Sequence, residues 1–325
     1  MSQYALEDLK EAGIKDIAII LGDIAPEKVV EHYGDGSKFG VDVTYVRQGE
    51  PRGIAQAIGL TRDFVRDEPF VVYLGDNLLR NGICDLVEEF ADSAVAAQVA
   101  LCQVNNPQAF GVAELDTRGK VVRLTEKPKA PKSDLALVGV YMFRRSIFDE
   151  IDSLKPSWRG ELEITEAIQR LIDMGLEVDA CRVSGWWKDT GKPEDVLEAN
   201  QLILSDIEPC NKGRLEQDVS ATGTLVIQEG TVIKAKSTLR GPLIIGKGCE
   251  IGPGTYIGPY TSIGDNVVVR GGEIENSIIL ADTAIECKKR IVDSLIGKGS
   301  RIIPSEDSMP KGYRLMVGEN TFLSI

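Results

Sequence analysis

An aliphatic residue recurs at every sixth position through the C-terminal third of the chain. A period of six fits neither an α-helix nor a flat strand, whose side-chain periods are about 3.6 and 2 residues. It is typical of a hexapeptide β-helix, in which each repeat forms one short face and the aliphatic side chains stack inward. We therefore predict a left-handed parallel β-helix, whose inward residues include Ile227, Ile233, Leu239, Ile245, Ile251, Ile257, Ile263 and Val269.

Glycine follows the stacked isoleucine in four consecutive repeats, from Ile245-Gly246 to Ile263-Gly264. A residue without Cβ suits a tight corner where a side chain would be crowded. The phase of the repeat slips near Gly271-Gly272, and aliphatic residues return at Ile279, Ile285 and Ile291.

The first two hundred residues have a different pattern, in which helix-like and strand-like stretches alternate. This alternation predicts an α/β domain, a Rossmann-like sheet with helices on both faces. Ligands bind at the carboxyl ends of the strands in such sheets. The wholly apolar run Phe70–Leu74 suits a buried central strand of a parallel sheet. Other expected strands are Asp16–Leu21, Val41–Arg47, Val95–Val104, Leu135–Phe143 and Glu177–Val183, with a hairpin at Val112–Leu115 and Val121–Thr125.

A chain of 325 residues has room for two domains. Residues 205–223 are polar and irregular, which is typical of a linker. We therefore predict a first domain at 1–204, a linker at 205–223 and a β-helix domain at 224–325.

The formal charge of −13 argues against nucleic acid as a partner, because phosphate backbones select basic surfaces. The sequence shows neither a membrane span nor a signal peptide, so we expect a cytoplasmic protein. Its six cysteines are widely spaced, which is typical of reduced thiols rather than a disulfide or zinc framework. The single histidine, His32, excludes a histidine-rich metal site.

Two segments of the α/β half are candidates for nucleotide and metal binding. The Gly-containing turn Gln48–Ala57 precedes a helix, whose free amides can bind a base or phosphate, although such a turn is more often only a loop. Asp76 follows the apolar strand in Leu74-Gly-Asp-Asn77 and can hold Mg²⁺ together with substrate phosphates. An isolated aspartate there is more often a turn or N-cap residue.

Two further segments have residues suited to a sugar phosphate. Glu126 can accept hydrogen bonds from sugar hydroxyls, and Lys127 offers a point charge for phosphate. Arg159 precedes a predicted helix and can bind phosphate through two hydrogen bonds. Asp189, in a turn after a strand, can be a second metal carboxylate. The alternatives are a solvated Glu-Lys pair and, for Trp186-Trp187, a core or interface role.

The order and wording of these motifs resemble the glucose-1-phosphate thymidylyltransferases, in the long form with an appended β-helix. The resemblance runs from about Gln3 to the C-terminus. It is carried by Gln48–Ala57, Tyr73–Asn77, Phe110–Ala113, Glu126–Pro128, Arg159–Thr165 and Gly185–Gly191.

The resemblance implies that dTTP and glucose-1-phosphate react in the presence of Mg²⁺ to give dTDP-glucose and pyrophosphate. It implies thymine recognition by Gln48 and Gly53, Mg²⁺ binding by Asp76 and Asp189, and sugar-phosphate binding by Lys127 and Arg159. The implied sugar pocket is lined by Gly111, Glu126, Val138 and Tyr141.

The family opens with a strand and a glycine-rich GxGTRLxP loop that grips the triphosphate, and this chain starts after both. The absent strand is a central one, so its loss should expose neighbouring strand edges and apolar surface. We interpret Met1 as an internal methionine of a longer reading frame. A truncated chain and a degenerate, non-catalytic relative are the alternatives. We expect the chain as written to be nearly inactive.

Other functions are compatible with parts of the pattern. UTP is an alternative nucleotide, because a thymine methyl discriminates only modestly. A regulatory relative could assemble as a homo-oligomer through its β-helix. Hexapeptide repeats also build acyltransferases, which typically use a histidine near the coils; no histidine follows His32 here, which disfavours that reading.

Overall fold

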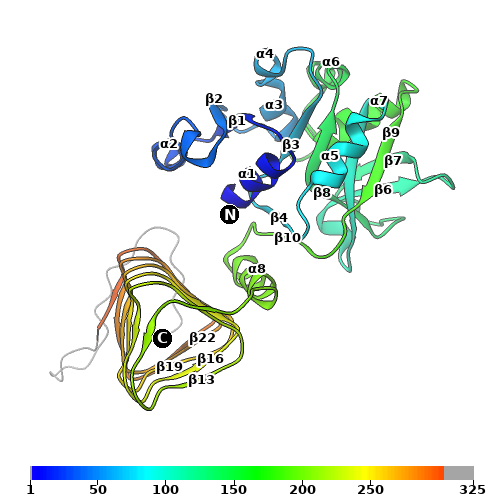
Figure 1. The fold of residues 1–325 in the computed structure, drawn as a ribbon. Helices are drawn as coiled ribbons and strands as arrows, with labels where there is room; N and C mark the ends of the chain where they lie inside the picture. The colour runs from blue at the N-terminus through cyan, green and yellow to red at the C-terminus, as the bar shows by residue number, and fades with distance from the viewer. Residues whose placement is uncertain (1, 304–325) are drawn as a thin grey trace, which may run out of the picture. The chain divides into compact units, whose positions relative to one another are not determined.

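The computed structural model describes residues 2–303, which divide into two compact units between Gly191 and Lys192 (Figure 1). The helices of the first unit are α1 (Ser2–Glu11), α2 (Pro26–Tyr33), α3 (Ile54–Gly59), α4 (Arg62–Val65), α5 (Cys84–Ala91), α6 (Ser146–Ser153) and α7 (Ile164–Asp173). Its strands are β1 (Asp16–Leu21), β2 (Asp42–Arg47), β3 (Phe70–Tyr73), β4 (Asn77–Leu79), β5 (Ala97–Gln103), β6 (Gly111–Leu115), β7 (Val121–Glu126), β8 (Leu135–Phe143), β9 (Val178–Arg182) and β10 (Trp187–Asp189).

The main sheet of the first unit has the order β7-β6-β8-β5-β9, with β3 also paired to β8. One face packs on α3, α6 and α7, and the other packs on α5 and part of α1. Helix α7 shows why: its buried Ile164, Ala167, Ile168 and Leu171 recur at the spacing of one helix face. The predicted α/β fold with helices on both faces is confirmed.

Strand β3 differs from its prediction as a buried central strand of a parallel sheet. All four of its residues are only half-buried, and its one partner is the antiparallel β8. The run is wholly apolar because helices cover both of its faces, while one backbone edge has no neighbouring strand within residues 2–303. An apolar composition therefore indicates that both faces of a strand are covered, and it does not indicate whether the strand is central or at the edge of the sheet.

A cavity of about 1440 Å³ separates β3 from β1, which pairs only with β2 in the described chain. We call it the β1–β3 cavity; every residue of both strands lines it, together with apolar side chains of α1, α3, α4 and α5. Two strand edges without partners thus flank an apolar space.

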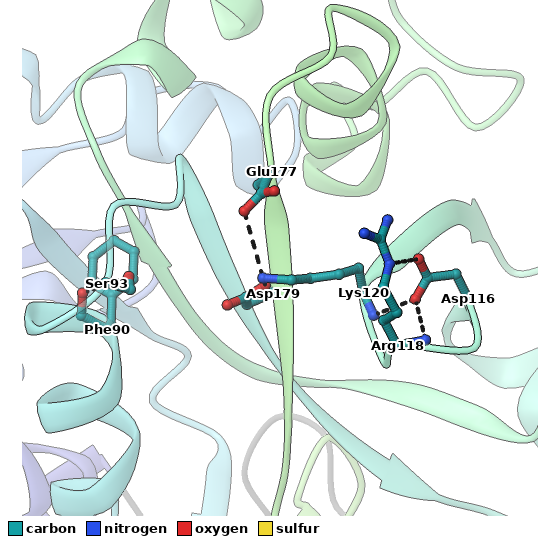
Figure 2. A network of polar contacts seen from close by, with 7 residues as sticks. All are labelled: Phe90, Ser93, Asp116, Arg118, Lys120, Glu177 and Asp179. Atoms are coloured by element: carbon teal, nitrogen blue, oxygen red, sulfur yellow. Dashed lines mark hydrogen bonds and ion pairs between the residues drawn. The ribbon is translucent and has the colours of Figure 1, made fainter.

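The β6–β7 hairpin turns at Asp116–Gly119, as predicted, and a charged network fixes it to β9 (Figure 2). Asp116 accepts hydrogen bonds from the backbone N–H groups of Lys120 (2.9 Å) and Arg118 (2.8 Å), and these bonds hold the pKa of its carboxyl below the usual range. The Lys120 ammonium contacts Asp179 and lies 3.6 Å from Glu177. This network supports the hairpin that carries Gly111 and Glu126, two of the predicted site residues.

The second unit is the predicted left-handed parallel β-helix. Strands stack on three faces with the orders β11-β14-β17-β20-β23-β26, β12-β15-β18-β21-β24-β27 and β13-β16-β19-β22-β25. Their bounds are β11 (Cys210–Asn211), β12 (Arg214–Leu215), β13 (Ser220–Thr222), β14 (Leu225–Ile227), β15 (Val232–Ile233), β16 (Thr238–Arg240), β17 (Leu243–Ile245), β18 (Glu250–Ile251), β19 (Tyr256–Ile257), β20 (Thr261–Ile263), β21 (Val268–Arg270), β22 (Glu273–Glu275), β23 (Ile278–Ile279), β24 (Ala284–Glu286), β25 (Arg290–Val292), β26 (Leu295–Ile296) and β27 (Arg301–Ile302).

The inward stack follows the hexapeptide period. All the aliphatic positions predicted between Ile227 and Val269 have an exposed fraction of 2% or less. The corner glycines are required sterically, since a Cβ on Gly246 would lie 2.4 Å from Asp265 Oδ1. At the phase slip, Ile274 continues the stack one residue early, opposite Ile257.

The β-helix begins earlier than the predicted boundary at residue 224. Residues 205–223, predicted as a linker, contain β11, β12 and β13 of the first coil. Residues 193–204, predicted to lie in the first domain, form most of helix α8 (Pro193–Ser205), which belongs to the second unit. There Asn200 donates to the Tyr260 carbonyl (2.8 Å) and accepts from the Ser262 hydroxyl (2.6 Å). The first coil escapes detection because its sequence lacks the Ile-Gly pairs of the later coils.

Candidate functional site

Two predicted metal ligands, Asp76 and Asp189, lie at neighbouring positions of a small antiparallel ladder. Asp76 directly precedes β4, and Asp189 is paired with Asn77 in the register of β4 with β10. The backbone N–H and the hydroxyl of Thr190 both donate to the Asp76 carbonyl, at 2.9 and 2.6 Å. The structure therefore brings together two aspartates that are 113 positions apart in the sequence (189 minus 76).

These two aspartates suit a divalent cation that also binds substrate phosphates, because Mg²⁺ typically takes one or two protein carboxylates and completes its shell with phosphate and water. Within residues 2–303 no group of three or more His, Cys, Asp or Glu side chains is arranged to hold a metal by itself.

Asn77 organises this corner, although sequence reasoning did not select it as a site residue. Its side chain is only 3% exposed. Its Oδ1 accepts from Trp187 Nε1 (2.7 Å) and from the Gly139 N–H (3.1 Å), and its Nδ2 donates to Asp76 Oδ1 (2.8 Å). A Cβ on Gly139 would lie 2.6 Å from Asn77 Nδ2, so β8 needs glycine there. The sequence signal that could have identified Asn77 is a polar residue next to an aspartate at the end of an apolar strand.

A second cluster contains Gly111 and Glu126, which were predicted to line the sugar pocket, and Arg159, which was predicted to bind the sugar phosphate. Gly111 lies opposite Glu126 in the β6–β7 ladder. The Thr165 hydroxyl donates to Glu126 Oε2 (3.2 Å), and Arg159 Nη1 lies 3.6 Å from Glu126 Oε1. A Cβ on Gly111 would lie 2.8 Å from Thr165 Cγ2 and 3.1 Å from Glu126 Oε2, so only glycine leaves this cluster undisturbed.

Lys127 adds a positive charge next to this cluster. Its backbone has φ of 41°, which is uncommon for a residue with a side chain, and its N–H donates to the Phe110 carbonyl (3.0 Å). Phe110 in turn packs edge-on against Trp187, with ring centroids 5.3 Å apart. This contact connects the sugar-phosphate cluster to the β4–β10 corner that carries the aspartates.

The carboxyl of Glu126 is held in an environment that disfavours its charge. Burial, followed by the nearby Glu163 carboxylate, raises its pKa, and Lys127, Thr165 and Arg159 only partly offset that rise. A buried carboxylate that retains hydrogen-bonding capacity suits recognition of sugar hydroxyls.

Glu126→Gln is therefore expected to raise Tm at pH 7. The folded pKa lies above the unfolded value of about 4.3, so ionisation above that pH favours the unfolded chain, and a neutral amide removes this cost. The gain should shrink as pH falls from the raised folded pKa towards the unfolded value and be small at about pH 4, where the carboxyl is mostly protonated in both states. Thermal melts at pH 7 and pH 4 measure this, with Glu114→Gln on the neighbouring strand as control; a fall in Tm at pH 7 would contradict the argument.

Gln48 and Gly53, predicted to recognise the base, lie in one loop next to the Arg159–Thr165 segment. Gln48 Nε2 donates to Gln56 Oε1 (2.9 Å), and Gln56 Nε2 donates to the Gln48 carbonyl (3.2 Å). The Leu162 N–H donates to the Arg52 carbonyl (2.7 Å), which ties the loop to the sugar-phosphate segment. Gly53 is the N-cap of α3, with φ of 109°.

Gly53→Ala is expected to destabilise the fold by about 2–5 kcal/mol, the sum of left-handed backbone strain and overpacking. A Cβ there would lie 2.5 Å from the Leu162 carbonyl oxygen. Gly175→Ala is the matched control, since its φ of 81° imposes strain but nothing lies within 4 Å. Denaturant unfolding of both variants separates the steric cost; equal losses would rule out close packing at Gly53 as the cause.

Tyr141 and Val138, predicted to line the sugar pocket, project to opposite faces of β8. Tyr141 belongs to the cluster with α3, α6 and α7, and burial, followed by the charges of Glu126 and Asp76, raises its pKa. Val138 is fully buried in the cluster on the other face, with Leu79 and Ile83. A pocket on the Glu126 side can therefore meet only the backbone of Val138.

Comparison with known proteins shows the family of the chain. The nucleotidyl transferase family model matches residues 1–206, and a model of the GMPPB C-terminal domain matches residues 239–306. The chain is 49% identical to the low-salt glycan biosynthesis nucleotidyltransferase Agl11 of Haloferax volcanii and 46% identical to a glucose-1-phosphate thymidylyltransferase of Streptomyces antibioticus. Each match covers 99% of this chain and 90% of the relative.

A solved structure is similar to part of the chain. It is a Bacillus anthracis protein described as a candidate glucose-1-phosphate thymidylyltransferase, in complex with a sucrose. It has a TM-score of 0.59 and 41% identity, and the match covers 64% of this chain and 84% of that one. No helix in the described part of the chain is long and apolar enough to cross a membrane. Enzymes of the matched family act on a nucleoside triphosphate and a sugar-1-phosphate and generally use a divalent metal. This chain belongs to the nucleotidyl transferase family.

Proposed function

We propose that the protein is a glucose-1-phosphate thymidylyltransferase that converts dTTP and glucose-1-phosphate to dTDP-glucose and pyrophosphate. The observation that carries the proposal is the convergence of Arg159, Glu126 and Thr165 beside Lys127, one aromatic contact away from the corner that holds Asp76 and Asp189. The 46% identity to a relative of that activity supports this choice of nucleotide and sugar.

In the proposed reaction, an oxygen of the sugar phosphate attacks the α-phosphorus of the nucleotide. The new O–P bond forms as the bond from the α-phosphorus to the β-phosphate oxygen breaks, and pyrophosphate leaves. The attacking phosphate is already an anion at pH 7, so the step needs no general base. Catalysis then depends on positioning and on neutralising charge.

Each residue group has a separate task in this scheme. Lys127 and Arg159 hold the sugar phosphate, and Glu126 accepts hydrogen bonds from the sugar. Gln48 and the amide of Gly53 face the base. Asp76 and Asp189 would hold Mg²⁺, which when bound neutralises charge on the transferring phosphates.

The test is pyrophosphate release with glucose-1-phosphate and Mg²⁺, with dTTP and UTP compared in parallel. The assay uses the chain as given and a version carrying an added N-terminal strand and GxGTRLxP loop, because two strand edges at the β1–β3 cavity have no partner among residues 2–303. We expect turnover with dTTP, mainly in the extended version. Preference for UTP would replace the proposed nucleotide, and absence of release with either nucleotide in both versions would refute the proposal.

A further inference from the structure

The Arg159 guanidinium is surrounded by three carboxylates, although the proposed function requires it to bind a phosphate. Its two terminal nitrogens have different partners. Nη2 donates to Glu161 Oε1 at 2.8 Å, whereas Nη1 lies 3.4 Å from Glu163 Oε1 and 3.6 Å from Glu126 Oε1. Both terminal nitrogens of Arg159 therefore already have carboxylate partners, and an anion that takes the position of Glu161 on Nη2 must displace that carboxylate.

The carboxylates differ in how firmly they are held. The Glu163 side chain is 10% exposed, and its Oε1 also accepts from the Ser157 hydroxyl (2.8 Å). That hydroxyl accepts from the Arg159 N–H (3.1 Å), so Ser157 connects the backbone of the arginine to the carboxylate that holds its head. The Glu161 side chain is 38% exposed, and its contact with Nη2 is the one most open to solvent.

We propose that Glu161 occupies the place of the substrate phosphate on Arg159 Nη2 and leaves it when the sugar phosphate binds, while Glu163 is a positioning residue that keeps Nη1 fixed. Carboxylate and phosphate compete directly because both match the guanidinium through charge-assisted hydrogen bonds. This inference rests on the proposed function, since it takes Arg159 to be a sugar-phosphate ligand.

The two glutamates therefore have opposite effects on affinity. Glu161→Gln removes a competing anion, and the dissociation constant of glucose-1-phosphate should fall about two- to fivefold, the scale of one exposed ion pair. Glu163→Gln removes the anchor from Nη1, and the dissociation constant should rise about tenfold, the scale of one charged hydrogen bond. A purely structural role for both residues would shift the two constants in the same direction.

The experiment is calorimetric titration of the full chain with glucose-1-phosphate and Mg²⁺, with and without a non-hydrolysable dTTP analogue. Glu166→Gln is the matched control, because its carboxylate pairs with Arg170 at 3.0 Å on the same segment, away from Arg159; its dissociation constant should stay within twofold of the wild type. Ser157→Ala is a milder second variant and should weaken binding in the same direction as Glu163→Gln. It keeps the test decisive if Glu163→Gln fails to fold.

Opposite shifts in Glu161→Gln and in Glu163→Gln or Ser157→Ala would support the proposal. Shifts in one direction, unchanged constants, or no binding by the wild type would overturn it. Because this readout is binding, it is separate from turnover. Opposite shifts without pyrophosphate release from any version of the chain would leave the exchange on Arg159 standing and refute the proposed reaction alone.

Discussion

Asp76→Asn is expected to lower kcat/KM for pyrophosphate release by at least about 10²- to 10³-fold, in whichever version of the chain turns over, with little change in Tm. The amide keeps the volume of the side chain, and its oxygen can still accept from Asn77 Nδ2, which donates to Asp76 Oδ1 at 2.8 Å. What is lost is the negative charge that holds a divalent cation against the transferring phosphates.

The measurement is initial rate against Mg²⁺ concentration, which should show both a lower maximum and a higher half-saturating concentration for the variant. Asp189→Asn should behave alike. Asp152→Asn is the control, because it deletes an equal charge from an exposed pair with Arg62 (2.6 Å) remote from the β4–β10 corner. If Asp76→Asn keeps activity within threefold and the same Mg²⁺ dependence, the two aspartates do not form the metal site.

Ile251→Ala should cost the β-helix about 2–5 kcal/mol, the range for removing a large aliphatic side chain from a core that cannot collapse around the cavity. Ile251 has no exposed surface and stacks between Ile233 and Val269 in successive coils. Because each coil contacts only its neighbours, the loss should weaken two interfaces at once.

Glu250→Ala is the matched control in the same strand, since the Glu250 side chain points outward and is 44% exposed. It should change stability by less than about 0.5 kcal/mol. Urea unfolding followed by far-UV circular dichroism measures both variants. Similar losses for the two substitutions would show that the stability of this strand does not reside in the inward stack.

Sequence patterns predict the β-helix well because the coils need an aliphatic side chain at the same inward position of each repeat. They fail at its first coil, where Leu215 and the exposed Ala221 occupy the positions opposite Ile233 and Leu239 and no Ile-Gly pair marks the corners. The phase slip near Gly271-Gly272 is visible in the sequence only as an interruption of the repeat, because nothing in the sequence indicates that a corner has lost one residue.

The sequence predicts the charged residues of the candidate site, but it does not predict the residues that hold them in place. No single structural role explains why aspartate, lysine and arginine all stand at strand ends and before helices. Their joint occurrence therefore indicates a binding site. Asn77 and Glu163 are missed because their roles depend on contacts across long sequence distances, as with Trp187 on Asn77. At Val138 the sequence predicts the strand correctly but not the face of the sheet to which the side chain points. That face depends on which helices cover each side of the sheet.

The β1–β3 cavity implies that the first unit exchanges its amide hydrogens in two blocks. Strands β5 and β8 each have strand partners on both edges, so their amides should be the slowest to exchange. The edges of β1 and β3 that face the cavity have no strand partner in the described chain, so their amides should exchange quickly although the side chains around them are apolar. The pair β1–β2, with the small core formed by Leu6, Ile17, Tyr33 and Val41, is thus expected to open as a cooperative segment of its own, well below the free energy at which the main sheet unfolds.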